Sequence, residues 1–269
     1  MDGSTPLRLS TRFLEKESWG AQDLAPWYPS PEKKIGEVWF EADIPLLVKF
    51  LFTSDRLSVQ VHPDDAFAAL HEKSLGKTEM WYVLRADPGA QLAIGFRETL
   101  TRDRLRESAL SGEIVNLLNW ISVEAGHAFF LPAGTVHAIG PGLALCEIQQ
   151  NSDVTYRLYD YGRPRELHLE KALQVASLAA SRPKPVMLPI DCQYFHTELA
   201  RIASPIHYVP APDRFHILIF VSGMGEIAGQ PFREGEAWLI PAGASRFQIR
   251  PADPVKFLRT WIPAASAPA

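Results

Sequence analysis

The sequence predicts a mainly β protein that consists of two jelly-roll β-barrels, with a few helices inserted in and between them. The first observation is a series of short apolar or alternating segments bounded by Gly, Pro, Asp or Asn, which is typical of antiparallel strands. The second is proline, which makes up 22 of 269 residues and favours strand ends and turns over helix interiors. The third is an internal repeat of one strand and its turns.

The expected strands of the N-terminal half are short and follow each other closely. They lie at residues 36–42, 46–52, 57–62, 79–84, 90–96, 127–132, 144–150 and 155–161. A second β-rich segment extends from residue 193 to residue 263. Strands at such regular spacing indicate barrels or sandwiches rather than alternating β and α units.

Helical patterns occur at only a few places. Pro63 suits the first turn of a helix that would include residues 64–73, and Thr101 can cap a helix over residues 102–112. Residues 166–180 carry apolar residues at helical spacing, and the proline-rich residues 181–190 indicate a linker.

These boundaries predict three parts. Residues 1–165 are expected to form a first domain with a helical insertion, residues 166–192 a helix and linker, and residues 193–269 a second barrel.

The charge balance and the cysteine content exclude several classes of protein. Lys and Arg total 27 against 31 Asp and Glu, a net charge of −4, so no overall positive field would attract nucleic acid or an anionic membrane. The two cysteines, Cys146 and Cys192, lack the spacing of a disulfide framework or a zinc finger. No stretch resembles a signal peptide or a membrane span. We expect a cytoplasmic protein without nucleic-acid or membrane partners.

The internal repeat relates residues 124–137 to residues 233–246. At a constant offset of 109, Gly126 matches Gly235, Pro132 matches Pro241, Gly134 matches Gly243, and His137 matches Arg246. Each copy reads as a glycine turn, a strand of five residues and a Pro-x-Gly turn. A single Pro-Ala-Gly turn recurs easily by chance, but the longer pattern indicates two copies of one unit.

The first copy resembles the second motif of the cupin superfamily, in which the residue that matches His137 is a metal ligand. The resemblance implies a first motif upstream, with two ligands one residue apart and an acidic ligand beyond them. Gln60 and His62 fit the pair, because residues two apart on a strand face the same side, as does Ser58. Glu79 fits the acidic ligand, since an unpaired carboxylate among large apolar residues would be costly.

The resemblance therefore implies a metal held by Gln60, His62, Glu79 and His137. Two imidazoles and a carboxylate suit Zn²⁺, one ion per chain, although the donor types are also compatible with manganese, iron or cobalt. A lone histidine on a strand is more often structural, so the joint match to both motifs carries the prediction. The other histidines fall outside the motifs, and we expect no ligand among them.

Longer segments resemble type I phosphomannose isomerase (mannose-6-phosphate isomerase), in its short bacterial form. The resemblance covers nearly the whole chain, and it is carried by Trp19-Gly20, IGEVWF at 35–40, LSVQVHPDD at 57–65, GKTEMWYVL at 76–84, LPAGTVHAIG at 131–140 and EIQQNSDVTYRLYDYGR at 147–163. The chain departs from the family where Ala21 replaces a usual glycine, and in its short C-terminal half.

The resemblance implies the metal-dependent interconversion of mannose 6-phosphate and fructose 6-phosphate through an enediol. This sugar phosphate chemistry needs a positive centre beside the enediolate, a base, an acid route for ring opening and an anchor for phosphate.

Four residues match the family's catalytic positions. Arg157, which follows NSD by three residues, would stabilise charge, and Glu147 is the candidate base, with a pKa that we expect burial to raise. Lys77 and Asp153 would assist ring opening and orientation. In the alternative reading, Arg157 is a solvated cation and Glu147 only pairs with a nearby lysine or arginine.

Ser58 and Arg163 are the candidates for binding the substrate phosphate, because a protein of net negative charge must supply positive charge and hydroxyl donors locally.

The second copy of the repeat has lost its ligand, since Arg246 stands where the first copy has His137. We expect no second metal site there, and a barrel that serves a structural role. Two other functions remain open from the sequence, a non-catalytic sugar-binding cupin or another metal cupin enzyme such as an iron dioxygenase.

Overall fold

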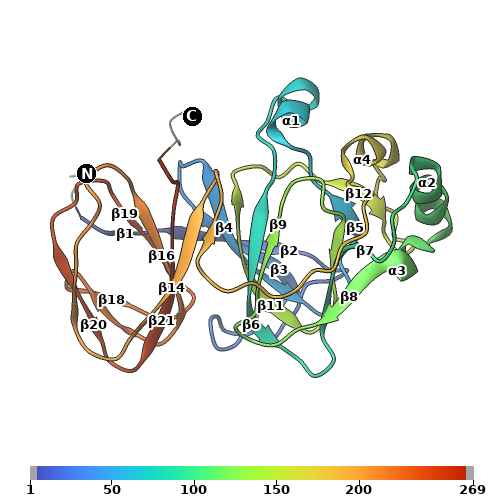
Figure 1. Cartoon of the computed structure of the whole chain (residues 1–269). Coiled ribbons are helices and arrows are strands. Elements are labelled where there is room, and N and C mark those ends of the chain that lie inside the picture. The colour runs from blue at the N-terminus through green and yellow to red at the C-terminus, as the bar shows by residue number, and fades with distance from the viewer. Residues whose placement is uncertain (1–4, 265–269) are drawn as a thin grey trace.

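The described residues, 5–264, form two β-barrels side by side in a computed structural model (Figure 1). The helices lie around the first barrel, away from the second. The mainly β class with a few helices, predicted from the short strands and their turns, is confirmed.

The first barrel consists of a six-stranded sheet in the order β2-β3-β4-β11-β6-β9 and a five-stranded sheet in the order β12-β5-β10-β7-β8. The strands of the first sheet are β2 (Ser10–Glu15), β3 (Ile35–Glu41), β4 (Leu46–Thr53), β11 (Leu143–Gln150), β6 (Glu79–Ala86) and β9 (Ala128–Leu131). Those of the second are β12 (Tyr156–Tyr159), β5 (Val59–Val61), β10 (His137–Ile139), β7 (Gln91–Phe96) and β8 (Leu118–Ser122). All pairings within the two sheets are antiparallel.

The second barrel combines a six-stranded sheet, β1-β19-β16-β21-β14-β13, with a four-stranded sheet, β15-β20-β17-β18. The first sheet contains β1 (Leu7–Arg8), β19 (Ala237–Ile240), β16 (His216–Ser222), β21 (Val255–Trp261), β14 (His196–Ile202) and β13 (Ile190–Asp191). The other contains β15 (Ile206–Tyr208), β20 (Phe247–Pro251), β17 (Gly225–Ile227) and β18 (Gln230–Phe232). A core with Phe220, Trp238 and Phe257 fills this barrel.

The helices are short, and two of them begin at the caps that their sequences supply. They are α1 (Asp65–His71), α2 (Arg102–Ser111), α3 (Ile114–Leu117) and α4 (Leu169–Val175). The Asp64 carboxylate accepts a hydrogen bond from the Phe67 backbone N–H, and the Thr101 hydroxyl accepts one from Arg104. The helix expected over residues 166–180 is confined to α4. Within residues 5–264, none of the helices has the length and apolar character that a membrane span requires.

The internal repeat corresponds to the same strand in the two barrels. β9 and β19 start at Ala128 and Ala237, which preserves the offset of 109. Gly126 and Gly235 before the strands have φ of 95° and 85°, a backbone conformation that favours glycine. The matched turns therefore form matched structures, even though only the first copy retains a histidine after its Pro-x-Gly turn.

The central strand β11 separates two environments through its period of two. Ala144, Cys146 and Ile148 belong to the apolar core that reaches the second barrel, while Leu143 and Leu145 pack inside the first barrel. Glu147 and Gln149 share the face of Leu143 and Leu145, and both are buried. A polar cluster is thus placed inside an otherwise apolar barrel.

In addition to the cores inside each barrel, the two barrels together form a further apolar core. Trp27 and Tyr28 belong to it, and their polar atoms donate to the second barrel: the indole N–H to the Val221 carbonyl at 2.9 Å and the hydroxyl to the Gly235 carbonyl at 2.6 Å. The first strand, β1, also pairs with β19. We propose the division into residues 1–165, 166–192 and 193–269, in which β1 from the first part and β13 from the second both join the six-stranded sheet of the third.

A chain that ends at residue 190 is expected to fold poorly. It would expose the core side chains that face Ile217, Ile219 and Leu258 and leave the donors of Trp27 and Tyr28 unpartnered. Soluble yield and a thermal melt, compared with those of the full chain, check this expectation. A soluble truncated chain with full activity would contradict it.

Candidate active site

Three strands of the first barrel bring together the residues predicted as metal ligands. His62 follows β5, Glu79 begins β6, and His137 begins β10. One potential ligand atom from each residue lies within 4.8 Å of the others, and all three side chains are buried. β10 and β5 are neighbours with His137 opposite Gln60, so the fourth predicted residue is adjacent.

The contacts within this group are short. Glu79 Oε1 lies 3.4 Å from His137 Nε2, and Glu79 Oε2 lies 3.6 Å from His62 Nε2. The Gln60 carboxamide nitrogen lies 3.4 Å from the same His137 Nε2. The four side chains therefore converge on one point.

Both imidazoles are oriented by the backbone. His62 Nδ1 donates to the Val154 carbonyl and His137 Nδ1 to the Thr135 carbonyl, each at 2.9 Å. A carbonyl can only accept, so Nδ1 carries the proton and Nε2 of the neutral ring retains its lone pair. Both Nε2 atoms face Glu79, as metal-binding histidines with backbone partners do.

The residues present fit a divalent cation. His62 Nε2 and both Glu79 oxygens are buried, and none of them has a hydrogen-bond partner among residues 5–264. Buried polar atoms of this kind require compensation. Two imidazole nitrogens and a carboxylate directed at one point would be compensated by a bound metal ion.

Burial shifts the pKa values of the group toward neutral forms. Desolvation, together with the nearby Glu147, raises the pKa of Glu79 to about 7, although Lys77 and Lys49 oppose the rise. Desolvation also lowers the pKa of His137 to about 4 and holds the pKa of His62 well below its usual value. Neutral imidazoles are the forms that bind metals, and a bound cation would favour ionised Glu79.

A cavity of about 350 Å³ lies beside this group, and all four predicted catalytic residues line it. The predicted residues that line it are Ser58, Gln60, Lys77, Glu147, Asp153 and Arg157. Arg157 on β12 lies opposite Gln60 in the register with β5, which places it at the same level as the metal ligands. Asp153 is exposed, whereas Lys77 and Glu147 are buried.

Arg163 does not line this cavity. Its guanidinium lies 3.2 Å from Asp55 and 3.4 Å from Asp160. Arg165 does line the cavity, and it contacts Asp160 through Nε at 2.6 Å and Nη2 at 2.7 Å. The buried Asp160 thus contacts both arginines, and of the two only Arg165 lines the cavity.

Glu147 belongs to a network of charges that lowers its pKa, contrary to the expectation from burial alone. Burial would raise this pKa, but Lys49 and Lys77 outweigh burial. Lys49 Nζ lies 2.9 Å from Glu147 Oε1, and the Trp81 indole donates to Glu147 Oε2 at 2.8 Å. The pairing that the sequence left open as an alternative is thus present, in the same cavity as Arg157.

Sequence reasoning missed Lys49 and Glu37, which complete this network. Lys49 is 6% exposed on β4, and its Nζ lies 3.4 Å from Glu37 on β3. Burial would raise the pKa of Glu37, but Lys49 and Lys16 lower it to about 2. The signal was available in LLVKFLF, because a lysine within an apolar strand is rarely buried unless it is paired.

Comparison with known proteins identifies the family. The mannose-6-phosphate isomerase ManA of Bacillus subtilis is 37% identical over 230 residues, which cover 76% of this chain and 71% of that protein. The chain belongs to the mannose-6-phosphate isomerase family. A mannose-6-phosphate isomerase of Streptococcus mutans is 48% identical over 140 residues, and this match spans only 44% of that relative and 50% of the chain. A search against family models found no match.

Solved structures agree with this assignment. The mannose 6-phosphate isomerase structure from Bacillus subtilis has a TM-score of 0.85 and 26% identity, and the match covers 95% of this chain and 99% of that chain. Membership of the mannose-6-phosphate isomerase family confirms the resemblance and the cupin fold predicted from the sequence. It does not favour the two alternative functions, the sugar-binding cupin and the other metal cupin enzyme.

Replacing a metal ligand is expected to remove both the bound metal and its stabilisation of the fold. His137→Ala should lower the metal content per chain, measured by elemental mass spectrometry, from about one to near zero. The melting temperature should then no longer respond to a chelator, because a ligand stabilises only the fold that binds it. His207→Ala, an exposed histidine of the second barrel, is the matched control and should retain the metal. Unchanged metal content in the His137 variant would contradict the assignment.

The Glu37 carboxylate is expected to stabilise the fold in a pH-dependent manner. Its pKa is about 2 in the fold against a usual 4.5, so its ionised form stabilises the fold above pH 4.5. This contribution, up to about 3 kcal/mol, is lost as the pH falls from 4.5 toward 2. Denaturant melts of Glu37→Gln and the parent chain should therefore differ at pH 6 and converge in acid.

Glu41→Gln provides the control, because Glu41 lies on the same strand in an exposed pair with Arg12. Such pairs contribute about 0–1 kcal/mol. A difference between Glu37→Gln and the parent that does not change with pH would refute the depressed pKa of Glu37.

Proposed function

We propose that this chain is a metal-dependent isomerase that interconverts mannose 6-phosphate and fructose 6-phosphate through an enediol. The observation that carries the proposal is the convergence of His62, Glu79 and His137 beside a cavity that Arg157 lines. Family membership supports the same reaction, since the relatives are named for it.

We propose that Gln60, His62, Glu79 and His137 hold one Zn²⁺ per chain. The histidine Nε2 atoms and the Glu79 oxygens are already directed toward one another. Rotating the Gln60 carboxamide by half a turn exchanges its nitrogen for its oxygen and completes the donor set. Bound there, the cation would supply positive charge beside the developing enediolate. The nitrogen and oxygen donors are what support zinc, and manganese, iron or cobalt are the alternatives.

The base in this proposal is Glu147, which moves the proton between C2 and C1. Lys49 and Lys77 keep its pKa low, so the carboxylate is ionised and able to accept a proton at neutral pH. The Trp81 indole fixes Glu147 Oε2, which leaves Oε1, on the side of the lysines, for the transfer. A base held in one position gains from orientation what it loses in basicity.

The guanidinium of Arg157 would stabilise the charge on the enediolate oxygens. It is fixed by donation from Nη1 to the Glu166 carbonyl at 2.6 Å, while its Nε is buried without a partner in residues 5–264. A donor that lacks a protein partner is suited to a substrate oxygen. Lys77, 3.3 Å from Glu79 and 3.8 Å from Glu147, would assist ring opening, and Asp153 would orient the sugar.

We propose that Ser58 and Arg165 bind the phosphate, and that Arg163 acts through Asp160 rather than by direct contact. Ser58 and Arg165 both line the cavity. Asp160 forms ion pairs with both Arg165 and Arg163, so it would hold the Arg165 guanidinium in position.

The proposed partner is a small sugar phosphate, with no nucleic acid and no membrane. The net charge of −4 and the small polar cavity support this assignment. We further propose a cytoplasmic location, which is supported by two free thiols, Cys146 and Cys192.

The decisive measurement is the formation of fructose 6-phosphate from mannose 6-phosphate in a coupled assay. Arg157→Ala should lower kcat by roughly 10²-fold or more, because it removes a cation that acts on transition-state charge. A chelator should abolish turnover, and added zinc should restore it. Arg201→Ala, an exposed arginine of the second barrel, is the matched control and should retain full activity. Turnover that is insensitive to both the chelator and Arg157→Ala would refute the mechanism.

A further inference from the structure

A second cavity lies at the outer edge of the five-stranded sheet, along β8. Its volume is about 830 Å³, compared with about 350 Å³ for the catalytic cavity, and the two share no lining residue. Small-molecule sites commonly have volumes of about 300–1,000 Å³. β8 is the last strand in the order β12-β5-β10-β7-β8, so it lies at the other edge of the sheet from Arg157 on β12, and the cavity extends from β8 to Arg56.

Three arginines from separate segments line this cavity, and no aspartate or glutamate does. Arg56 precedes β5, Arg97 follows β7, and Arg182 follows α4. Within residues 5–264 none of the three forms an ion pair, whereas the exposed Arg104 and Arg106 both pair with glutamates. In a chain of net charge −4, this is a local excess of positive charge.

The backbone brings two of these arginines to neighbouring positions. The Ser181 N–H donates to the Phe96 carbonyl at 2.9 Å. Arg182 follows Ser181 and Arg97 follows Phe96, so the two arginines have neighbouring backbones. The Asn119 amide reinforces the junction by donating to the Phe96 carbonyl at 2.9 Å and to the Ser181 carbonyl at 3.2 Å. Two arginines that start from neighbouring backbone positions favour a ligand with more than one anionic group.

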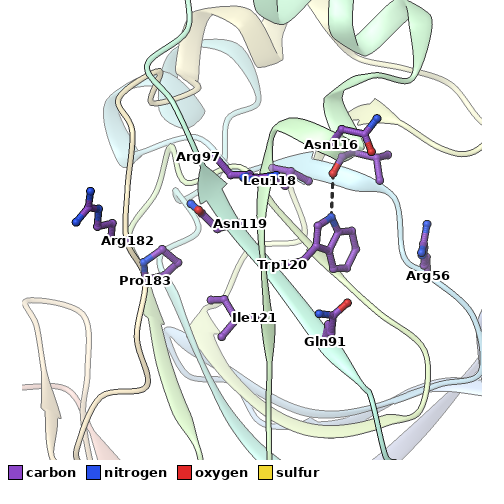
Figure 2. Close-up of a pocket in the computed structure, with 11 residues that line it drawn as sticks. Arg56, Gln91, Arg97, Asn116, Leu118, Asn119, Trp120, Ile121, Arg182 and Pro183 are labelled. Atoms are coloured by element: carbon purple, nitrogen blue, oxygen red, sulfur yellow. Dashed lines mark hydrogen bonds between the residues drawn. The ribbon is translucent and has the colours of Figure 1, made fainter.

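An indole ring lies between the arginines. In Figure 2, Arg182 and Arg56 are on opposite sides of the view, with Asn119 and Trp120 between them. Trp120 Nε1 donates to the Val115 carbonyl at 2.9 Å, and the Arg56 guanidinium lies over the ring at 5.4 Å. The ring is therefore held in a fixed orientation, and its hydrogen-bond donor is already used. The ring is only half-buried, so the part that Arg56 leaves uncovered is a stacking surface for a ligand.

Two neutral amides complete the polar lining. The side chains of Gln91 and Asn116 have no hydrogen-bond partner within the described part of the chain, and both line the cavity. Each offers donors and an acceptor, the groups that sugar hydroxyls require.

We propose that this cavity binds a nucleoside diphosphate. The phosphates would lie at Arg97 and Arg182, whose planar forks match phosphate oxygens, and the base would stack on Trp120. Gln91 and Asn116 would bind the ribose hydroxyls. A sugar monophosphate carries a single phosphate and no aromatic ring, so it would use only part of this surface.

Calorimetric titration of the full chain with ADP tests the proposal, with pyrophosphate and mannose 6-phosphate as comparison ligands. ADP should bind at least tenfold more tightly than pyrophosphate, because only ADP carries a base, and its affinity should fall with added salt. The double variant Arg97→Ala with Arg182→Ala should weaken ADP binding at least tenfold. The charge-matched pair Arg201→Ala with Arg233→Ala, on the second barrel, should not change it.

Two further variants separate the site from the alternatives. Arg157→Ala should leave ADP affinity unchanged, which distinguishes this cavity from the catalytic one. Arg182→Glu, a single change at an exposed residue, repeats the test if the double variant is unstable. Four results would each overturn the proposal: no ADP binding at millimolar concentration, equal affinity in the cavity and control pairs, pyrophosphate binding as tightly as ADP, or loss of binding in Arg157→Ala.

Discussion

The structure of the active site depends on one buried carboxylate. Glu79 is 1% exposed, and its neighbours are two neutral imidazoles and a second carboxylate, Glu147. A negative charge in such a place is unstable unless positive charge is supplied close by. The chain supplies part of it through Lys77 at 3.3 Å, and the two imidazoles are placed so that a metal ion could supply the rest. The ligands, the lysines and the cavity all follow from this requirement.

Lys49 and Lys77 each lie close to two carboxylates. Lys77 lies between Glu79 and Glu147, and Lys49 lies between Glu147 and Glu37. Strand register produces this alternation, because Lys49 on β4 is directly opposite Glu147 on β11. Opposite charges at paired positions are retained within the barrel, where water screens them little. The candidate metal ligand Glu79 and the candidate base Glu147 are thus coupled through shared cations.

The two barrels share a repeated strand and its turns, but they differ at the position that matters for the candidate metal site. Both preserve the glycine turns around β9 and β19. After its Pro-x-Gly turn, the first copy places a histidine inside the barrel, while the second has Arg246, which is exposed. The second barrel instead contributes an apolar surface against the sheet that carries Lys49 and Glu147. This contact covers the face of that sheet opposite Lys49 and Glu147.

The sequence by itself determined the β class, the repeat and three residues, His62, Glu79 and His137, that the fold brings together as a candidate metal site. Turn glycines, the alternation of side chains along strands and the spacing of potential ligands are local properties of the chain. They can therefore be recognised in the sequence alone. Only the tertiary structure decided that Lys49 and Glu37 join the site, that Arg165 rather than Arg163 faces the cavity, and that the pKa of Glu147 falls. These outcomes depend on which side chains from distant strands share one buried space, and a pKa responds to every charge in that space. These distances are set by which strands pair and in what register, so they cannot be deduced from positions in the sequence.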